Sequence, residues 1–288
     1  MRINALTQYS GRATRAAAFA LLSLGLSGCT MFGLFGPPKI QEEAIIPDDT
    51  LYQEAIKDMD ERRYMTAVSV LAKLERQHPY SSYAEKAKLM TVYAYFRLGK
   101  YPDAALAADR YLALYPSAPE AAYVLYLKGS SYYGQITDIT RDQQLAQQTI
   151  DTFKLLISTY PDSKYVSDAQ DKIQLAYDQL AGKDMSVGRY YEGNGKYTAA
   201  INRFRNVVEQ YQTTNQIEEA LFRLTESYLA LGLTNEAQTA AAVLGHNYPS
   251  SQWYQEAFNL LKKVGLQPKV VGDNWITKAS ANVPAKAG

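Results

Sequence analysis

The sequence contains one cysteine and two histidines among its 288 residues. One cysteine excludes a disulfide within the chain, and two histidines leave little material for a metal site. Lysine and arginine (30) nearly balance aspartate and glutamate (29), so the net charge of +1 gives no indication of nucleic acid as a partner. The chain also lacks a glycine-rich phosphate loop and an HExxH motif. These absences argue against an enzyme and predict no cofactor and no metal.

Apolar runs long enough to span a bilayer are missing as well. Residues 16–26 form an apolar run of only eleven residues, which suits the core of a signal peptide. Three arginines and no acidic residue precede Cys29. The sequence therefore predicts a lipoprotein signal peptide at residues 1–28 that is absent from the mature protein.

A leucine and two small residues, Leu26-Ser27-Gly28, stand directly before Cys29. They resemble the lipobox of bacterial lipoproteins, and the resemblance implies cleavage before Cys29 and lipidation of its thiol. The alternative is an ordinary signal peptide with an incidental cysteine, but a free thiol is a liability in an oxidising compartment. Thr30 rather than aspartate follows, which in such lipoproteins favours the periplasm-facing leaflet of the outer membrane. Residues 29–48 are rich in proline and predict a lipidated, flexible tether.

A repeated spacing organises the rest of the chain. A small residue is followed by a helix-ending residue twelve positions later, for example Ala67 and Pro79 (79 − 67 = 12). The five pairs are Ala67/Pro79, Ala104/Pro116, Thr149/Pro161, Ala200/Gln212 and Ala237/Pro249. This pattern resembles the tetratricopeptide repeat. It predicts an all-α, right-handed solenoid of five helical hairpins over residues 49–266 with a C-terminal capping helix. An ordinary helical bundle with chance spacing is the alternative.

The third and fourth repeats are longer than the others. The extra residues of the third predict a loop at 134–142, which is either a partner contact or a tolerated surface loop. The fourth predicts one long helix over about 163–192. Ser82, Ser117 and Asn215 each precede a glutamate by three residues, a pattern that predicts capped helix starts there. Residues 267–288 have no periodicity and predict a disordered tail.

A binding groove is expected on the first helices of repeats two and three, where aromatic residues align with one cation. The candidates are Leu89, Tyr93, Phe96, Arg97, Arg110, Tyr123, Tyr126, Ser130 and Tyr133. An extended peptide that ends in an aromatic residue and a carboxylate would suit them, with Arg97 or Arg110 pairing with the carboxylate. Alternatively, these tyrosines fill seams between repeats. His78 and His246 lie near the ends of second helices and are expected to bind carbonyls there.

Several stretches resemble the BamD (ComL/YfiO) family of outer-membrane protein assembly lipoproteins. They are VYAYFRLGKYPDAALAADRYLALYP, YLKG, LLISTYPDSKYVSDA and AINRFRNVVEQY, and the resemblance covers about residues 50–261. It implies a scaffold in the β-barrel assembly (BAM) complex, together with other BAM lipoproteins. The C-terminal repeats would bind a POTRA domain of BamA, and the N-terminal repeats would bind the C-terminal targeting signals of unfolded outer-membrane proteins. In AINRF, Arg203 matches the family's arginine at the BamA contact; the alternative is a simple exposed charge.

Two other classes of protein remain open at this point. A different periplasmic repeat lipoprotein, in pilus assembly or the cell envelope, would share the solenoid but not the long fourth repeat or AINRF. A lytic transglycosylase would need a separate catalytic domain, and the repeats leave no residues to build one.

Overall fold

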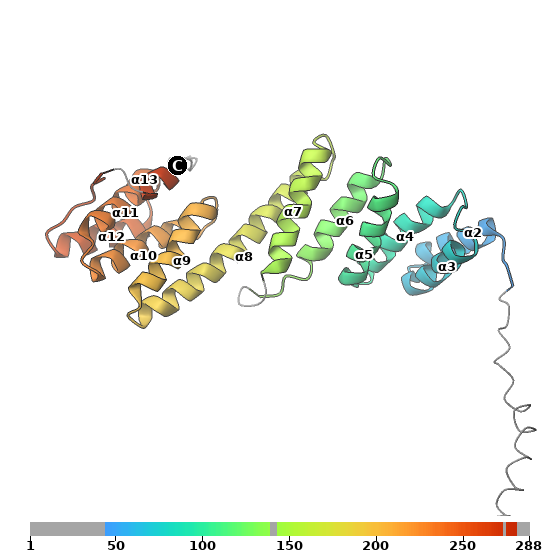
Figure 1. Cartoon of the computed structure of the whole chain (residues 1–288), viewed down its shortest axis with the longest axis horizontal. Coiled ribbons are helices and arrows are strands. Elements are labelled where there is room, and N and C mark those ends of the chain that lie inside the picture. The colour runs from blue at the N-terminus through green and yellow to red at the C-terminus, as the bar shows by residue number, and fades with distance from the viewer. Residues whose placement is uncertain (1–43, 139–142, 273–274, 281–288) are drawn as a thin grey trace, which may run out of the picture. The chain divides into compact units, whose positions relative to one another are not determined.

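The structure is a computed structural model that describes residues 44–138, 143–272 and 275–280. The signal peptide, Cys29, most of the tether, part of the 134–142 loop and the last eight residues lie outside these ranges. The chain divides into two units, residues 1–45 and 46–288. In the second unit the described residues form twelve helices and no strand (Figure 1). They are α2 (Asp48–Asp60), α3 (Tyr64–Gln77), α4 (Ala84–Arg97), α5 (Tyr101–Leu114), α6 (Ala121–Tyr133), α7 (Gln144–Thr159), α8 (Val166–Gly193), α9 (Tyr197–Gln210), α10 (Ile217–Ala230), α11 (Thr234–Asn247), α12 (Gln252–Lys263) and α13 (Trp275–Ser280).

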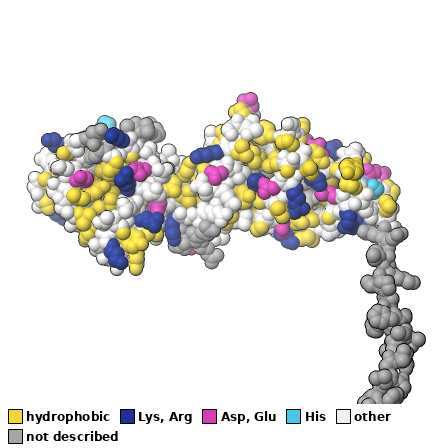
Figure 2. Space-filling view, viewed as in Figure 1, with side chains coloured by type: hydrophobic (Ala, Val, Ile, Leu, Met, Phe, Trp, Pro, Cys, Tyr) yellow, Lys and Arg dark blue, Asp and Glu magenta, His cyan; other side chains and the backbone are white. Residues whose placement is uncertain are grey.

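The helices pack as five successive hairpins, from α2–α3 to α10–α11, and each hairpin packs on the next. Helix α12 covers α10 and α11, as expected of the capping helix. The all-α hairpin stack predicted from the repeat spacing is thus confirmed. None of the helices described is both long and apolar enough to cross a membrane. Basic and acidic side chains are interspersed on the face shown in Figure 2, so neither sign dominates it.

The small residue of each repeat is fully buried, as expected of a position where two helices cross. The five residues Ala67, Ala104, Thr149, Ala200 and Ala237 all have 0% exposure. The turn between the helices needs a left-handed residue, and Gly99, Gly195 and Gly232 supply it with φ of 69°, 70° and 73°. In the first hairpin Arg62 takes the same conformation, with φ of 58°.

Helix α8 runs for 28 residues without interruption, which confirms the long helix of the fourth repeat. Figure 1 shows it extending from α7 to α9. Its Gly188 permits a close approach, since a Cβ there would lie 2.4 Å from the Phe204 ring of α9. Gly182 is buried inside the same helix.

The predicted caps at Ser82, Ser117 and Asn215 are wrong. Helices α4, α6 and α10 begin later, and none of their starts has a side-chain cap. Directly before α4 and before α8 the chain makes a hydrogen-bonded turn. In each turn the side chain of the first residue, a serine, accepts a backbone N–H group. Ser81 accepts the N–H of Tyr83 (3.1 Å), and Ser163 accepts that of Tyr165 (3.3 Å). Because two serines are adjacent at 81–82, the sequence pattern does not show which of them accepts the backbone hydrogen bond.

At the N-terminal end of the solenoid, a residue of the predicted tether packs against the first hairpin. Ile46 donates its N–H to Gln77 Oε1 (3.0 Å), and its carbonyl lies 2.7 Å from His78 Nε2. His78 therefore binds the entering chain rather than carbonyls of its own helix. The role expected of His246 stays a prediction.

The described part of the predicted disordered tail is folded, which corrects that expectation. Lys269 donates its N–H to Gln238 O (3.3 Å), and Val271 donates to Thr239 Oγ1 (3.1 Å). Helix α13 then packs on α9 and α11 with Ile276 fully buried. A six-residue helix is too short to show a helical period in the sequence, and this is why it was missed.

Candidate functional site: an aromatic strip and a positioned arginine

Aromatic and cationic side chains from α3, α4, α6 and the start of α8 form a connected series, here called the aromatic strip. It consists of Tyr64, Tyr93, Arg97, Tyr123, Tyr126, Tyr133, Tyr165 and Lys172. Five of the eight were candidates from the sequence, whereas Tyr64, Tyr165 and Lys172 were not.

Arg97 is the exposed cation of the strip. It donates to the Tyr93 hydroxyl at 2.5 Å, and its guanidinium carbon lies 5.4 Å from the Tyr64 ring centre and 5.5 Å from that of Tyr93. The hydrogen bond to Tyr93 raises the pKa of Arg97, which keeps the guanidinium charged. In the ranges that the structure describes, Arg97 has aromatic partners but no carboxylate. Tyr64 and Tyr93 therefore fix the position of the guanidinium, and no carboxylate of the described residues neutralises its charge.

Tyr165 closes the strip from the following repeat. Its ring stacks on Tyr126 (4.7 Å, 19°) and on Tyr123 (5.3 Å, 26°). Burial raises the pKa of Tyr123 to about 12, so its hydroxyl remains a hydrogen-bond donor at physiological pH. Tyr123 and Tyr165 also line an open cavity of about 620 Å³ together with Lys164.

Tyr126 and Tyr133 meet the second cation of the strip, Lys172 of α8. Its Nζ lies 5.6 Å from the Tyr126 ring centre and 5.8 Å from that of Tyr133. Unlike Arg97, Lys172 is paired with a carboxylate, that of Asp168. Tyr126 also packs on Phe153 at 6.1 Å. Tyr126 therefore fills a seam between hairpins, the alternative that the sequence had left open.

The other groove candidates lie beside the strip. Leu89 and Phe96 are half-buried and pack against the core beneath it, Phe96 with its ring 5.8 Å from that of Tyr101. Ser130 is buried. Arg110 is exposed on the second helix α5, and no contact joins it to the strip in the described residues. Of the two cations considered for a terminal carboxylate, only Arg97 lies among the aromatic rings.

Arg203, on α9, is a positioned arginine rather than a free surface charge. Its Nη1 lies 3.1 Å from Oδ1 of Asp184, a carboxylate of α8 that is only 6% exposed. Asn206 donates to the other oxygen of Asp184 at 2.5 Å. Half of the Arg203 side chain remains exposed and lines a hollow of about 490 Å³ with Tyr191, Asn202 and Asn206. The geometry holds the guanidinium in place while leaving it accessible.

A protein-family model described as an outer membrane lipoprotein, YfiO, matches residues 45–244. The chain belongs to the YfiO (BamD) family. The outer membrane protein assembly factor BamD of Caulobacter vibrioides is 40% identical over 262 residues, which are 91% of this chain and 85% of that protein. The BamD of Rickettsia prowazekii is 39% identical over 85% of this chain and 96% of its own. The family named from the sequence is therefore confirmed.

More distant members of the YfiO (BamD) family match over most of the chain as well. BamD of Neisseria meningitidis serogroup A is 32% identical over 82% of this chain and 92% of that protein. A solved structure of PilW, a type IV pilus biogenesis factor, matches at 15% identity over 73% of this chain and 97% of its own, with a TM-score of 0.34. That similarity is too low to bear on the fold or the function.

Proposed function

We propose that this chain is a non-catalytic scaffold of the BAM complex, anchored to the periplasm-facing leaflet of the outer membrane through lipidated Cys29. Its partners are then the POTRA domain of BamA, the other BAM lipoproteins and the C-termini of unfolded outer-membrane proteins. Support comes from the BamD names of its relatives and from the lipobox in the sequence. Membrane fractionation tests the anchor: Cys29→Ala should release the protein, and an unchanged outer-membrane fraction would contradict it.

The aromatic strip is the proposed site for the substrate C-terminus. The observation that carries this proposal is Arg97, which tyrosine rings hold without a neutralising carboxylate. A terminal carboxylate would pair with Arg97, while a terminal aromatic side chain would stack beside Tyr93 or Tyr123. Main-chain groups of an extended peptide could then follow the strip toward α8.

Calorimetry with a peptide that ends in a free phenylalanine carboxylate, and with its C-terminal amide, tests this site. We expect the amide to bind about tenfold more weakly, and Arg97→Met to remove the difference between the two peptides. Lys86→Met, at an exposed cation of α4, is the matched control. Equal affinity of acid and amide for the wild-type protein would exclude a carboxylate site at Arg97.

Arg203 is the proposed contact for BamA. Arg203→Glu would place a second carboxylate beside buried Asp184, so a loss of binding could reflect local unfolding. Arg203→Met avoids this repulsion and should weaken BamA binding by about 1–3 kcal/mol. It leaves buried Asp184 with Asn206 as its side-chain donor, so circular dichroism should first show that the variant is folded at the temperature of the binding measurement. Unchanged affinity would remove Arg203 from the interface.

A pilus-assembly or cell-envelope scaffold is the competing function. The tagged mature protein, purified from solubilised envelopes, separates the two by mass spectrometry of its companions. BamA in near-equal amount supports the BAM scaffold, whereas a pilus secretin or a cell-wall enzyme in its place would contradict it.

A further inference from the structure

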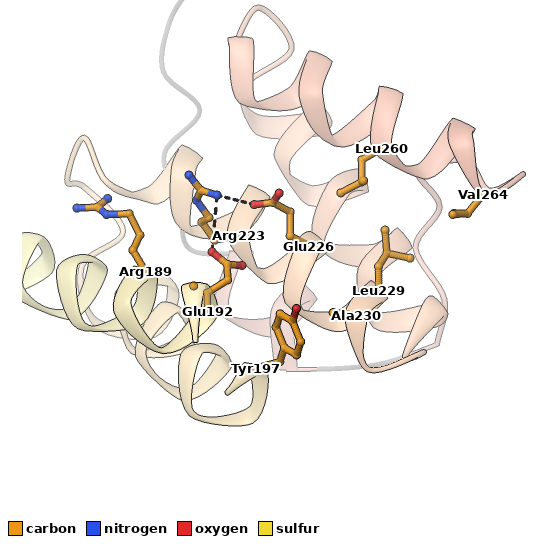
Figure 3. A pocket seen from close by; sticks show the side chains of 10 residues that line it. Arg189, Glu192, Tyr197, Arg223, Glu226, Leu229, Ala230, Leu260 and Val264 are labelled. Atoms are coloured by element: carbon orange, nitrogen blue, oxygen red, sulfur yellow. Dashed lines mark hydrogen bonds and ion pairs between the residues drawn. The ribbon is translucent and has the colours of Figure 1, made fainter. Parts of the chain in front are cut away.

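A second open cavity lies between the last turn of α8, the start of α9, α10 and α12, and neither Arg97 nor Arg203 lines it. Its volume is about 640 Å³. Figure 3 shows charged side chains on one side of it and aliphatic ones on the other. The charged side is formed by Glu192, Arg223 and Glu226, and the aliphatic side by Leu229, Leu260 and Val264.

The charged side has one carboxylate more than it has cations. Arg189 pairs with Glu219 at 3.0 Å, and Arg223 also approaches Glu219 at 3.3 Å. Glu192 and Glu226 are therefore left to share Arg223, at 3.6 Å and 2.7 Å. Three carboxylates face two guanidinium groups, so the cluster carries an excess of one negative charge.

Burial makes this excess costly for the protein alone. It raises the pKa of Glu192 and of Glu226, which means that their present partners do not fully compensate for the loss of water. Ser227 donates to Oε1 of Glu192 at 2.8 Å, and one oxygen of Glu226 has no hydrogen bond in the part of the chain described. An additional cation between the two carboxylates would lower both pKa values and fill this gap.

The aliphatic side indicates what should carry that cation. Val264 is 58% exposed and stands at the rim beside Leu260. Hydrophobic side chains also gather over the C-terminal helices on the face shown in Figure 2, with charged side chains beside them. A lysine or arginine side chain buries its methylene stem on apolar surface while its charged end reaches polar groups. A free polyamine would leave the exposed aliphatic rim uncovered.

We infer that this cavity receives a lysine or arginine side chain of a partner protein, with its stem against Leu229, Leu260 and Val264 and its charge between Glu192 and Glu226. This docking site is separate from the aromatic strip and from Arg203. If no basic side chain binds in this cavity, the proposed scaffold function still stands. If the scaffold function is wrong, the cavity can still bind a basic side chain.

Methyl NMR of the mature chain with three peptides tests the inference. The probes are acetyl-Ala-Leu-Lys-Leu-Ala-amide and its norleucine and glutamate counterparts at the lysine position. We expect the lysine peptide to shift the methyl signals of Leu229, Leu260 and Val264 and to bind about fivefold more tightly than the norleucine peptide. Glu226→Gln and Glu192→Gln should abolish that preference, while Glu54→Gln, at an exposed site on α2, should preserve it.

Three results would overturn the inference. One is equal binding of the lysine and norleucine peptides to the wild-type chain, and another is no shift of these three methyl groups by any peptide. The third is binding of spermidine with the same shifts and an affinity equal to that of the lysine peptide, which would indicate a small-amine site. Because glutamine has the shape of glutamate, circular dichroism should show that both variants keep their helical content.

Discussion

At the scale of single residues, Arg62 is the position where the chain departs from its own repeat. The other hairpin turns described above have glycine in the left-handed conformation, which costs a non-glycine residue about 1–2 kcal/mol. Arg62→Gly should therefore raise the free energy of unfolding by about 0.5–1 kcal/mol, after allowance for the flexibility that glycine adds to the unfolded chain. Urea denaturation measures the difference.

Arg62→Ala is the matched control, because it removes the charge and keeps the Cβ. It should change the stability by no more than about 0.5 kcal/mol. An equal gain from Arg62→Ala and Arg62→Gly would show that charge, rather than backbone strain, destabilises this turn.

Comparison of equivalent positions in the repeats shows which residues of the aromatic strip the sequence could have revealed. The residue four positions after each terminal proline is aromatic in three repeats: Tyr83, Tyr165 and Trp253 (79 + 4, 161 + 4 and 249 + 4). Each packs against an aromatic residue of the preceding repeat, with ring centres 4.3 Å apart for Tyr52, 4.7 Å for Tyr126 and 5.3 Å for Phe222. The repeat spacing thus contained the signal for Tyr165. Lys172 had no such signal, because it stands eleven positions after Pro161 and no cation stands at that distance after the other terminal prolines.

At the scale of elements, the fit between α8 and α9 depends on Gly188 and Phe204 together. A methyl group at 188 would overlap the Phe204 ring, since the two would be 2.4 Å apart. Gly188→Ala should lower the free energy of unfolding by about 1–3 kcal/mol. Adding Phe204→Leu should recover part of that loss, so the double-mutant cycle should give a favourable coupling.

Gly193→Ala serves as the control for that cycle. A Cβ at 193 has no neighbour within 4 Å, and alanine favours a helix more than glycine does. We expect no loss of stability from it. If Gly188→Ala were equally harmless, the close approach of α8 and α9 would not depend on glycine.

Element boundaries separate what the sequence could predict from what it could not. Helices α2–α12 follow from periodicity and the twelve-residue spacing because each has at least three turns that repeat an apolar face. Helix α13 has six residues, and its position depends on single contacts: Arg205 lies 4.7 Å from the Trp275 ring, and Trp275 Nε1 donates to the Tyr228 hydroxyl at 3.2 Å. Such contacts between segments distant in the sequence have no period to reveal them.

Docking of α13 can be measured through Trp275. The chain has two tryptophans, so Trp253→Phe leaves Trp275 as the only tryptophan reporter and keeps an aromatic ring against Phe222. Ile276 is fully buried, so Ile276→Ser should undock α13 and shift the Trp275 emission to the red. Ile276→Val should keep the emission of the parent. Emission that is the same for both variants would mean that Ile276 does not hold α13 in place.

At the scale of the whole molecule, a solenoid is stabilised mainly by contacts between neighbouring repeats, so different regions can respond to pH independently. Burial acts to raise the pKa of Asp168, but hydrogen bonds from Lys172 and Tyr126 outweigh it and the net pKa is lowered. The folded state then binds fewer protons at Asp168 than the unfolded chain does. Its contribution to stability is present above the ordinary aspartate pKa and is lost as the pH falls.

Glu192 and Glu226 should produce the opposite pH dependence at the C-terminal end. Their raised pKa values mean that the folded state binds more protons than the unfolded chain, so this region loses stability as the pH rises above the ordinary glutamate pKa. Hydrogen exchange, corrected for the intrinsic effect of pH, should show the end of α8 and α10 becoming less protected over that range. The start of α8, around Asp168, should become more protected as the pH rises through the acidic range up to the ordinary aspartate pKa. Glu192→Gln with Glu226→Gln should remove the first trend and leave the second, whereas trends of the same sign in both regions would contradict the assignment of these carboxylates.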